Sequence, residues 1–148
     1  MATMRVSRVL HAPIERVWQV FADIPAAADR LSGVSKIDVL SDLPFGPGFR
    51  WRETRRMLGK DATEEMWVSM AQEPDFYEVA AASRGMEYLS RYDFTAVPDG
   101  TKVELVFTGT PTSTMAKLMD KTMALTSGPL RKALSQDMAD LAAVCEAE

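Results

Sequence analysis

The sequence predicts an α+β protein in which a curved, seven-stranded antiparallel sheet is closed by a long C-terminal helix. Three patterns lead to this class. Apolar and polar residues alternate in short segments between residues 34 and 109, as they do in strands. Short turns rich in glycine and proline join these segments, which is typical of an antiparallel meander. Residues 113–147 carry apolar side chains at helical spacing. Helices gathered on one face of an antiparallel sheet form an α+β architecture.

The N-terminal part predicts one strand followed by two helices. Residues 4–11 alternate with a period of two, which indicates a strand. Pro13 suits the first position of a helix, because its missing N–H is not needed there. Residues 13–22 then form one apolar face from Ile14, Val17, Trp18 and Phe21. A second short helix is expected over residues 25–31.

Six further strands and one long helix are expected after this start. The strands are predicted over residues 34–40, 48–57, 62–71, 76–83, 86–96 and 101–109. The helix is predicted over residues 113–147, with a kink or break at Gly128-Pro129. The order is therefore β-α-α-β6-α, and we expect residues 1–148 to form one domain.

A hollow between the sheet and the last helix follows from this layout. A sheet of about seven strands twists and coils, whereas a helix is nearly straight. The two surfaces therefore cannot mesh along their whole length. We expect a cavity between them, lined by apolar side chains from the inner face of the sheet.

Composition excludes several kinds of protein. The formal net charge of -4 argues against a nucleic-acid partner, which favours a basic surface. One cysteine and one histidine are too few for a disulfide or a typical metal site, and no cofactor fingerprint is present. The N-terminus lacks the apolar segment of a signal peptide. The sequence also contains no run of about 18 apolar residues, the length that a membrane-spanning helix needs. We therefore expect a cytoplasmic protein with no metal and no cofactor.

Three segments resemble one known group of proteins. They are residues 6–18 (VSRVLHAPIERVW), residues 46–55 (GPGFRWRETR) and residues 99–103 (DGTKV). The chain resembles the START/Bet v 1-like (SRPBCC, polyketide cyclase/dehydrase-like) superfamily along essentially its whole length, and its segment 46–55 resembles the third-strand motif of bacterial members. The resemblance implies a helix-grip fold with an internal cavity. It does not imply one function, because the group includes lipid and sterol carriers, polyketide cyclases, hormone receptors and regulators of chaperones and ribosomes.

The alternation of residues in the strands predicts which side chains line the cavity. Ten methionines add flexible apolar side chains, which adapt to ligands of irregular shape. Three of them lie four residues apart on the last helix, although simple core packing also explains them. The expected ligand-binding residues are Trp51, Glu53, Met66, Val68, Tyr88, Tyr92, Phe94, Leu105, Phe107, Met115, Met119 and Met123.

Polar residues on the same face are the candidates for acid–base chemistry. A carboxylate inside an apolar cavity is costly unless it is paired, and Arg8 or Arg55 could pair with it. Without a pair its pKa would rise, which suits a general acid or base. An ion pair at the rim of the sheet is the other interpretation. The catalytic residues are not determined by the sequence, and the candidates are Glu53, Glu64, Tyr88 and Tyr92.

Three functions remain open at this point. The first is binding of a small hydrophobic or aromatic ligand, lipid- or polyketide-like, without chemistry. The second is an enzyme similar to the polyketide cyclases or dehydrases. The third is a protein-interaction regulator, which would have a filled cavity and a large exposed apolar patch. Trp67 faces away from the cavity side, and its exposure would indicate a homodimer contact.

Overall fold

The computed structural model describes residues 2–57, 59–83, 85–113 and 128–147. Its elements follow the expected order of one strand, a helical segment, six strands and a C-terminal helix. Their bounds are β1 Ala2–Leu10, α1 Ile14–Ala22, the 3-10 helix η1 Ile24–Ala26, α2 Ala27–Arg30, β2 Val34–Val39, β3 Arg50–Met57, β4 Lys60–Gln72, β5 Phe76–Ser83, β6 Met86–Val97, β7 Gly100–Pro111 and α4 Gly128–Glu146.

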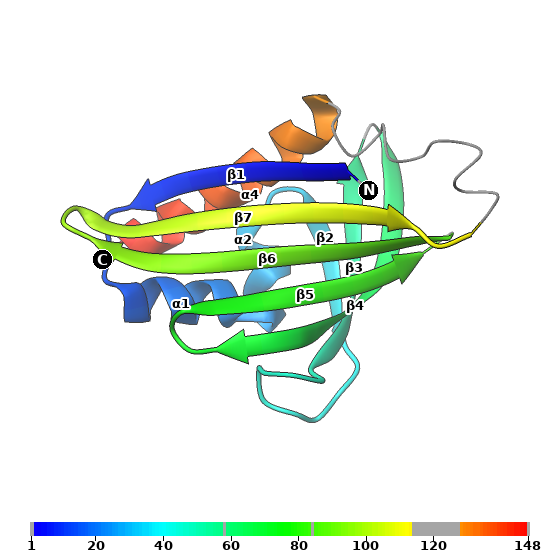
Figure 1. Cartoon of the computed structure of the whole chain (residues 1–148), viewed down its shortest axis with the longest axis horizontal. Coiled ribbons are helices and arrows are strands. Elements are labelled where there is room, and N and C mark those ends of the chain that lie inside the picture. Colours follow the sequence, from blue (N-terminus) through cyan, green and yellow to red (C-terminus); the bar gives the residue numbers. More distant parts are fainter. Residues whose placement is uncertain (1, 58, 84, 114–127, 148) are drawn as a thin grey trace.

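The seven strands form one antiparallel sheet in the order β1-β7-β6-β5-β4-β3-β2. From β2 to β7 each strand pairs with the next in the chain, and β1 completes the sheet beside β7 (Figure 1). This confirms the predicted α+β helix-grip fold with its antiparallel meander. The predicted strands were correct in number and order, and their ends differ from the observed ones by a few residues.

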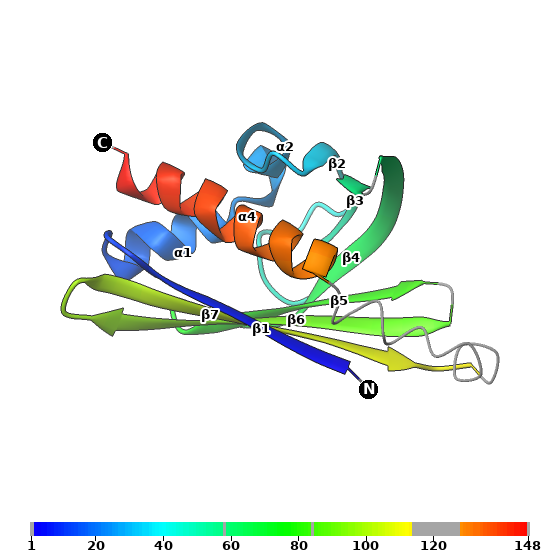
Figure 2. The same ribbon diagram turned by 90° about the horizontal axis from the view of Figure 1, so that it is seen from above.

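The sheet is strongly curved, and part of the curvature has a local cause. The pairing of β4 with β5 shifts register between Val68 and Met70. A bulge of this kind bends its strand and increases its twist. Figure 2 shows β3 and the upper part of β4 turning up from the plane of β5, β6 and β7 toward α4. The inner face of the sheet is therefore concave, as the sequence predicted.

The helices all lie on this concave side (Figure 2). The buried face of α1 contains Val17, Trp18, Val20 and Phe21. The rings of Trp18 and Phe21 meet Phe94 of β6 edge to face, with centroids 5.3 and 5.4 Å apart. The segment after α1, predicted as one short helix over residues 25–31, consists of η1 followed by the single turn α2. This helical segment covers one end of the sheet and leaves the rest to α4.

The C-terminal helix rests on other helices and on one edge of the sheet. Its main contacts are with β1, α1 and α2. Near its end, Glu146 accepts a hydrogen bond from the backbone N–H of His11, and Met138, Ala142 and Cys145 are buried. The guanidinium of Arg131 donates to the carbonyl of Arg5 in β1. The centre of the sheet is therefore spanned by α4 rather than filled by it.

Part of the predicted C-terminal helix lies outside the described residues. The structure confirms a helix over residues 128–146 of the predicted range 113–147. The described helix begins at Gly128, so the predicted kink at Gly128-Pro129 is not tested. Met115, Met119 and Met123 also lie outside the described residues. Within the part of the chain that the structure describes, no helix is both long enough and apolar enough to cross a membrane.

Candidate ligand-binding site

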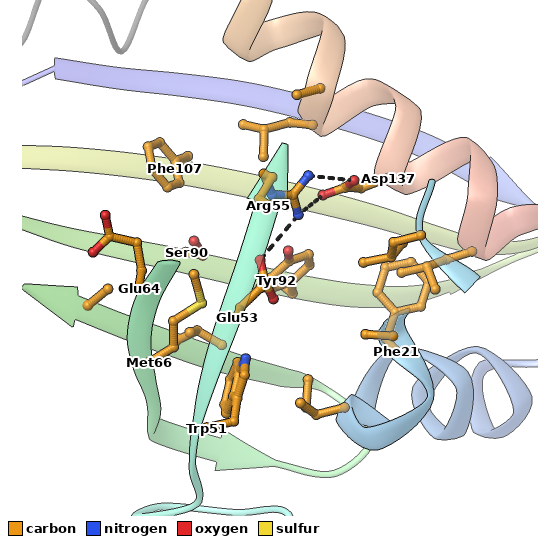
Figure 3. A pocket seen from close by; sticks show the side chains of 18 of the residues that line it. Phe21, Trp51, Glu53, Arg55, Glu64, Met66, Ser90, Tyr92, Phe107 and Asp137 are labelled. Atoms are coloured by element: carbon orange, nitrogen blue, oxygen red, sulfur yellow. Dashed lines mark hydrogen bonds and ion pairs between the residues drawn. The ribbon is translucent and has the colours of Figure 1, made fainter. Parts of the chain in front are cut away.

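A cavity of about 330 Å³ lies between the inner face of the sheet, the α1–α2 segment and α4 (Figure 3). Strands β3 to β6 each contribute alternate residues, since every second side chain faces the same side. The sheet lines the cavity with Trp51, Glu53, Arg55, Ala62, Glu64, Met66, Tyr77, Val79, Ala81, Tyr88, Ser90, Tyr92 and Phe107. The helices and their loops add Val20, Phe21, Asp23, Ile24, Ala27, Arg30, Leu31, Leu130, Ala133, Leu134, Asp137 and Leu141.

The floor of the cavity is hollow because its middle strand carries small side chains. Tyr77, Val79 and Ala81 of β5 line the cavity, and only Tyr77 of these three has a large side chain. By register Ala81 lies between Met66 of β4 and Tyr88 of β6, which are much larger. Small residues flanked by large ones leave space that the straight helix above does not fill. The result is a recess with an apolar floor and aromatic sides.

One wall contains a buried cluster of charges. The guanidinium of Arg55 in β3 donates to both carboxylate oxygens of Asp137 in α4, at 3.0 and 2.8 Å. It also donates to Glu53 at 3.3 Å (Figure 3). The three side chains are only 19%, 15% and 12% exposed in the order Arg55, Asp137 and Glu53. The forked geometry matches a carboxylate with two parallel hydrogen bonds, which is the strong form of this pair.

The surroundings of this cluster change how its groups hold protons. Burial raises the pKa of Asp137, although the hydrogen bonds and charge of Arg55 oppose the rise. Burial also raises the pKa of Tyr92, and the charges of Asp137 and Glu53 act in the same direction. Burial tends to lower the pKa of Arg55, but its bonds to Asp137 and the negative charges nearby outweigh this and raise it. The Tyr92 hydroxyl and the guanidinium therefore stay protonated, while Asp137 takes up a proton more readily than a carboxyl in water.

Comparison with known proteins identifies the family. The sequence model of the family described as "Polyketide cyclase / dehydrase and lipid transport" matches residues 1–146. The chain belongs to this family. Its fold is that of the SRPBCC superfamily, as the sequence predicted. No curated protein sequence matched the chain.

Solved structures of this family's fold resemble the chain closely in shape. The di-domain ARO/CYC BexL from the BE-7585A biosynthetic pathway matches with a TM-score of 0.81 at 17% identity, over 99% of this chain and 50% of BexL. This chain therefore spans about half the length of BexL. The Zhui aromatase/cyclase from Streptomyces sp. R1128 matches with a TM-score of 0.80 at 13% identity, over 97% of this chain and 93% of Zhui. Ara h 8.0201 matches with a TM-score of 0.64 at 11% identity, over 94% of this chain and 97% of that structure. At these identities the likeness shows the fold.

In this family member most of the predicted site residues border the cavity. These are Trp51, Glu53, Glu64, Met66, Tyr88, Tyr92 and Phe107. Val68, Phe94 and Leu105 do not line it: they are 1%, 4% and 2% exposed and lie in the hydrophobic core. Phe94 shows the reason, because its ring is covered by Trp18 and Phe21 of α1. Alternation along a strand predicts the face of a residue but not which element covers it.

The structure also shows which residues pair with the cavity carboxylate Glu53, and it adds one residue that was not predicted from the sequence. Of the two arginines considered as partners of Glu53, Arg55 makes the contact and Arg8 is exposed. Asp137 was missed, although a signal was present. It falls on the same helical stripe as Leu130, Leu134 and Leu141, and a charged residue on an apolar stripe indicates a buried partner.

An outer groove of about 300 Å³ adjoins the cavity near the start of α4. It is lined by Ser32, Gly33, Arg55, Arg56, Pro129, Lys132, Ala133, Gln136 and Asp137. Arg55, Ala133 and Asp137 border both hollows. A Cβ at Gly33 would lie 3.0 Å from a nitrogen of Arg55, so the loop passes close over the guanidinium. The Arg55–Asp137 ion pair is thus part of the wall between the cavity and the groove.

Asp140 of α4 binds Ser32, which precedes Gly33 in the loop between α2 and β2. Replacing Asp140 gives a prediction with a defined pH dependence. Its carboxylate accepts hydrogen bonds from the N–H and hydroxyl of Ser32 and from Gln136, each at 2.9 Å. Burial acts to raise its pKa, but these hydrogen bonds outweigh burial and lower it from 3.8. The Asp140 carboxylate therefore stabilises the fold at pH values above the pKa that Asp140 has in the unfolded chain. This stabilisation is lost as the pH falls through the lower pKa that Asp140 has in the folded protein.

We expect Asp140→Asn to lower the free energy of unfolding by about 0.5 to 1 kcal/mol at pH 7, since the site is exposed. The difference from wild type should shrink as the pH falls below 3.8 and should vanish only below the lowered pKa of folded Asp140, where both chains lack the charge. Urea unfolding across this pH range measures it. Asp42→Asn is the control, since Asp42 is exposed and the structure shows no ion pair for it with another described residue. Equal effects of the two substitutions would contradict the assignment.

Proposed function

We propose that the chain binds a small hydrophobic or aromatic molecule, lipid- or polyketide-like, in the cavity between the sheet and α4. The observation that supports this most is the cavity itself, whose lining is mainly apolar and aromatic with a few convergent polar groups. Pockets of about 300 to 1,000 Å³ with such a lining are typical sites for small molecules. Affinity would come from removing apolar surface of the ligand from water, less the cost of association.

A second function, polyketide cyclase or dehydrase chemistry, is supported by the charged cluster. Arg55 could stabilise the negative oxygen of an enolate, and Asp137 or Glu53 could accept the proton lost from carbon. The new carbon–carbon bond would form as the enolate attacks a second carbonyl of the same chain. The resulting alkoxide would take a proton, and loss of water would follow in a dehydrase. Tyr92, with its raised pKa, would serve as a hydrogen-bond donor to such a carbonyl.

The third function, a protein-interaction regulator, has less support. It predicts a filled cavity, whereas the space here is about 330 Å³. The predicted homodimer contact at Trp67 stays a prediction. Trp67 is half-buried, and the guanidinium of Arg50 lies 4.6 Å from the centre of its ring. A cytoplasmic location and the absence of a nucleic-acid partner also stay predictions, based on the single cysteine and the acidic charge.

Native mass spectrometry of the purified protein tests the binding function. We expect an added mass of a small organic molecule that disappears on denaturation, or saturable binding of the neutral fluorescent probe N-phenyl-1-naphthylamine. Absence of both would contradict the proposal. The cyclase function is tested by incubation with a linear poly-β-ketone thioester. A cyclised or dehydrated product formed faster than without protein would support it, and unchanged rates would leave binding as the function.

A further inference from the structure

Trp51 presents an unused hydrogen-bond donor in the wall of the cavity. Its indole N–H is buried and has no hydrogen-bond partner among the residues that the structure describes. The side chain lines the cavity and is 2% exposed. Figure 3 shows its nitrogen at the end of the ring that is turned toward Glu53 and the interior of the site. A buried indole N–H usually has an acceptor, because leaving it unpaired is costly.

The neighbours of Trp51 explain why no side chain serves as that acceptor. Its cross-strand partner is Met66, whose thioether is only a weak acceptor. On the other side the ring packs against Phe49, with centroids 5.7 Å apart. Glu53 follows two residues later on the same face, but its carboxylate is bound to Arg55. The donor is therefore unpaired at the wall of the cavity, and because its nitrogen has almost no accessible surface, a ligand oxygen would reach it when the flexible side chain of Met66 shifts.

The charges around the cavity restrict which acceptors can approach. Its lining includes two cations, Arg30 and Arg55, and four carboxylates, from Asp23, Glu53, Glu64 and Asp137. Both cations are already paired, Arg30 with Asp23 and Arg55 with Asp137 and Glu53. An anionic ligand would meet excess negative charge in a site of low polarity, which is unfavourable. A neutral oxygen, as in a ketone, ester or ether, has no such penalty.

The shape of the lining indicates a ligand with flat rings. The rings of Tyr77 and Tyr92 stack 4.8 Å apart, and those of Tyr88 and Phe107 stack 5.8 Å apart. Both pairs contribute to the cavity wall. Aromatic faces and edges favour contacts with other ring systems over flexible saturated chains.

We propose that Trp51 determines specificity by donating a hydrogen bond from Nε1 to a neutral carbonyl or ether oxygen of a ring-containing ligand. This inference rests on the proposed binding function and names the ligand class that the site selects. Hydrocarbons would leave the N–H unpaired, and free carboxylic acids would meet the excess negative charge. Trp51 is thus a positioning and specificity residue, separate from the charged cluster.

Three naphthalenes of similar shape test the proposal by displacement of N-phenyl-1-naphthylamine. They are 2-acetylnaphthalene, which has a neutral acceptor, 2-isopropenylnaphthalene, which has none, and 2-naphthoate, which is anionic. We expect the ratio of ketone affinity to alkene affinity to be about tenfold larger in wild type than in Trp51→Phe. A factor of this size corresponds to one buried hydrogen bond. Comparing the ratio between proteins removes the different hydration of the two ligands. Naphthoate should bind more weakly than the ketone in both proteins.

Trp67→Phe is the matched control, since Trp67 lies in the next strand and faces away from the cavity, and its ligand ratio should equal that of wild type. A second readout needs no substitution in the cavity. The chain has three tryptophans, so the ketone should shift the Trp51 indole N–H resonance in a 15N-correlated spectrum and the alkene should not. An unchanged ratio, or equal shifts with both ligands, would overturn the inference and leave cavity binding intact. If none of the ligands displaces the probe, the binding function and this inference both fail.

Discussion

Replacement of Arg55 by methionine is expected to lower the free energy of unfolding by about 3 kcal/mol at neutral pH. The substitution keeps most of the side-chain volume but leaves Asp137 and Glu53 without a cation. Both carboxylates are largely buried, at 15% and 12% exposed, so water compensates them poorly. Urea unfolding followed by far-UV circular dichroism measures the change.

The pH dependence of this variant separates loss of charge pairing from loss of packing. Burial already raises the pKa of Asp137, and removal of Arg55 takes away what opposes that rise. In the folded variant Asp137 then binds a proton more tightly than it does in the unfolded chain. The variant is therefore more stable at pH values below the pKa of Asp137 in the unfolded chain, and it loses this stability as the pH rises through the higher pKa of Asp137 in the folded protein. The gap between Arg55→Met and wild type should therefore narrow toward acid pH. A gap independent of pH would contradict the role of charge.

Two controls sharpen the test. Arg56→Met alters the neighbouring residue, whose side chain is 65% exposed and, among the described residues, pairs with the exposed Asp61 and a backbone carbonyl. It should change stability by less than about 0.5 kcal/mol. The double variant Arg55→Met with Asp137→Leu should recover only part of the lost stability, because an apolar group replaces one of the two unpaired carboxylates while Glu53 still lacks a cation. Equal losses at Arg55 and Arg56 would show that the cluster is not buried as described.

Replacement of Ala81 by phenylalanine is expected to weaken binding of N-phenyl-1-naphthylamine by about 100-fold or more, equivalent to about 2.7 kcal/mol. Ala81 lies on the floor of the cavity and is 8% exposed. A phenyl group there would project into the space of about 330 Å³ and occupy the place of a ring-sized ligand. Fluorescence titration of the probe measures the change.

Ala82, the residue that follows Ala81, provides a matched control for the Ala81→Phe substitution. Ala82 is exposed and points to the opposite face of β5, so Ala82→Phe adds the same group outside the cavity. It should leave the affinity unchanged. Ala81→Phe should still fold, since the new ring enters existing space rather than a packed core. Unaltered probe binding by a folded Ala81→Phe protein would show that the ligand site lies elsewhere.

The fold could be predicted from the sequence because its signals are local. The strands from β2 to β7 are joined by connections that contain turn residues, and each of them pairs with the next strand along the chain. The apolar face of α1 follows from Val17, Trp18 and Phe21 at helical spacing. Element ends were less certain, as in β4, which begins at Lys60 rather than residue 62. Hydrogen bonds to the next strand decide such ends, and polar turn residues do not reveal them.

The site could be predicted only in part, for a reason that particular residues show. Trp51, Glu53 and Met66 were placed correctly on the cavity side, since alternation assigns faces. Phe94 has the same facing but lies beneath α1. Whether Phe94 lines the cavity or is buried depends on where α1 crosses the sheet. That position is set by contacts between residues far apart in the chain.

The sequence by itself determined the meander, the concave apolar face, the helix that spans it and the need for a hollow between them. These follow from periodicity and turn chemistry, which act over a few residues. Only the tertiary structure decided that Asp137 meets Arg55 across 82 positions of sequence and that the indole N–H of Trp51 is left without an acceptor. Which residues meet depends on the angle and separation of packed elements, and a local pattern such as the apolar stripe of α4 indicates a buried partner for Asp137 without identifying it.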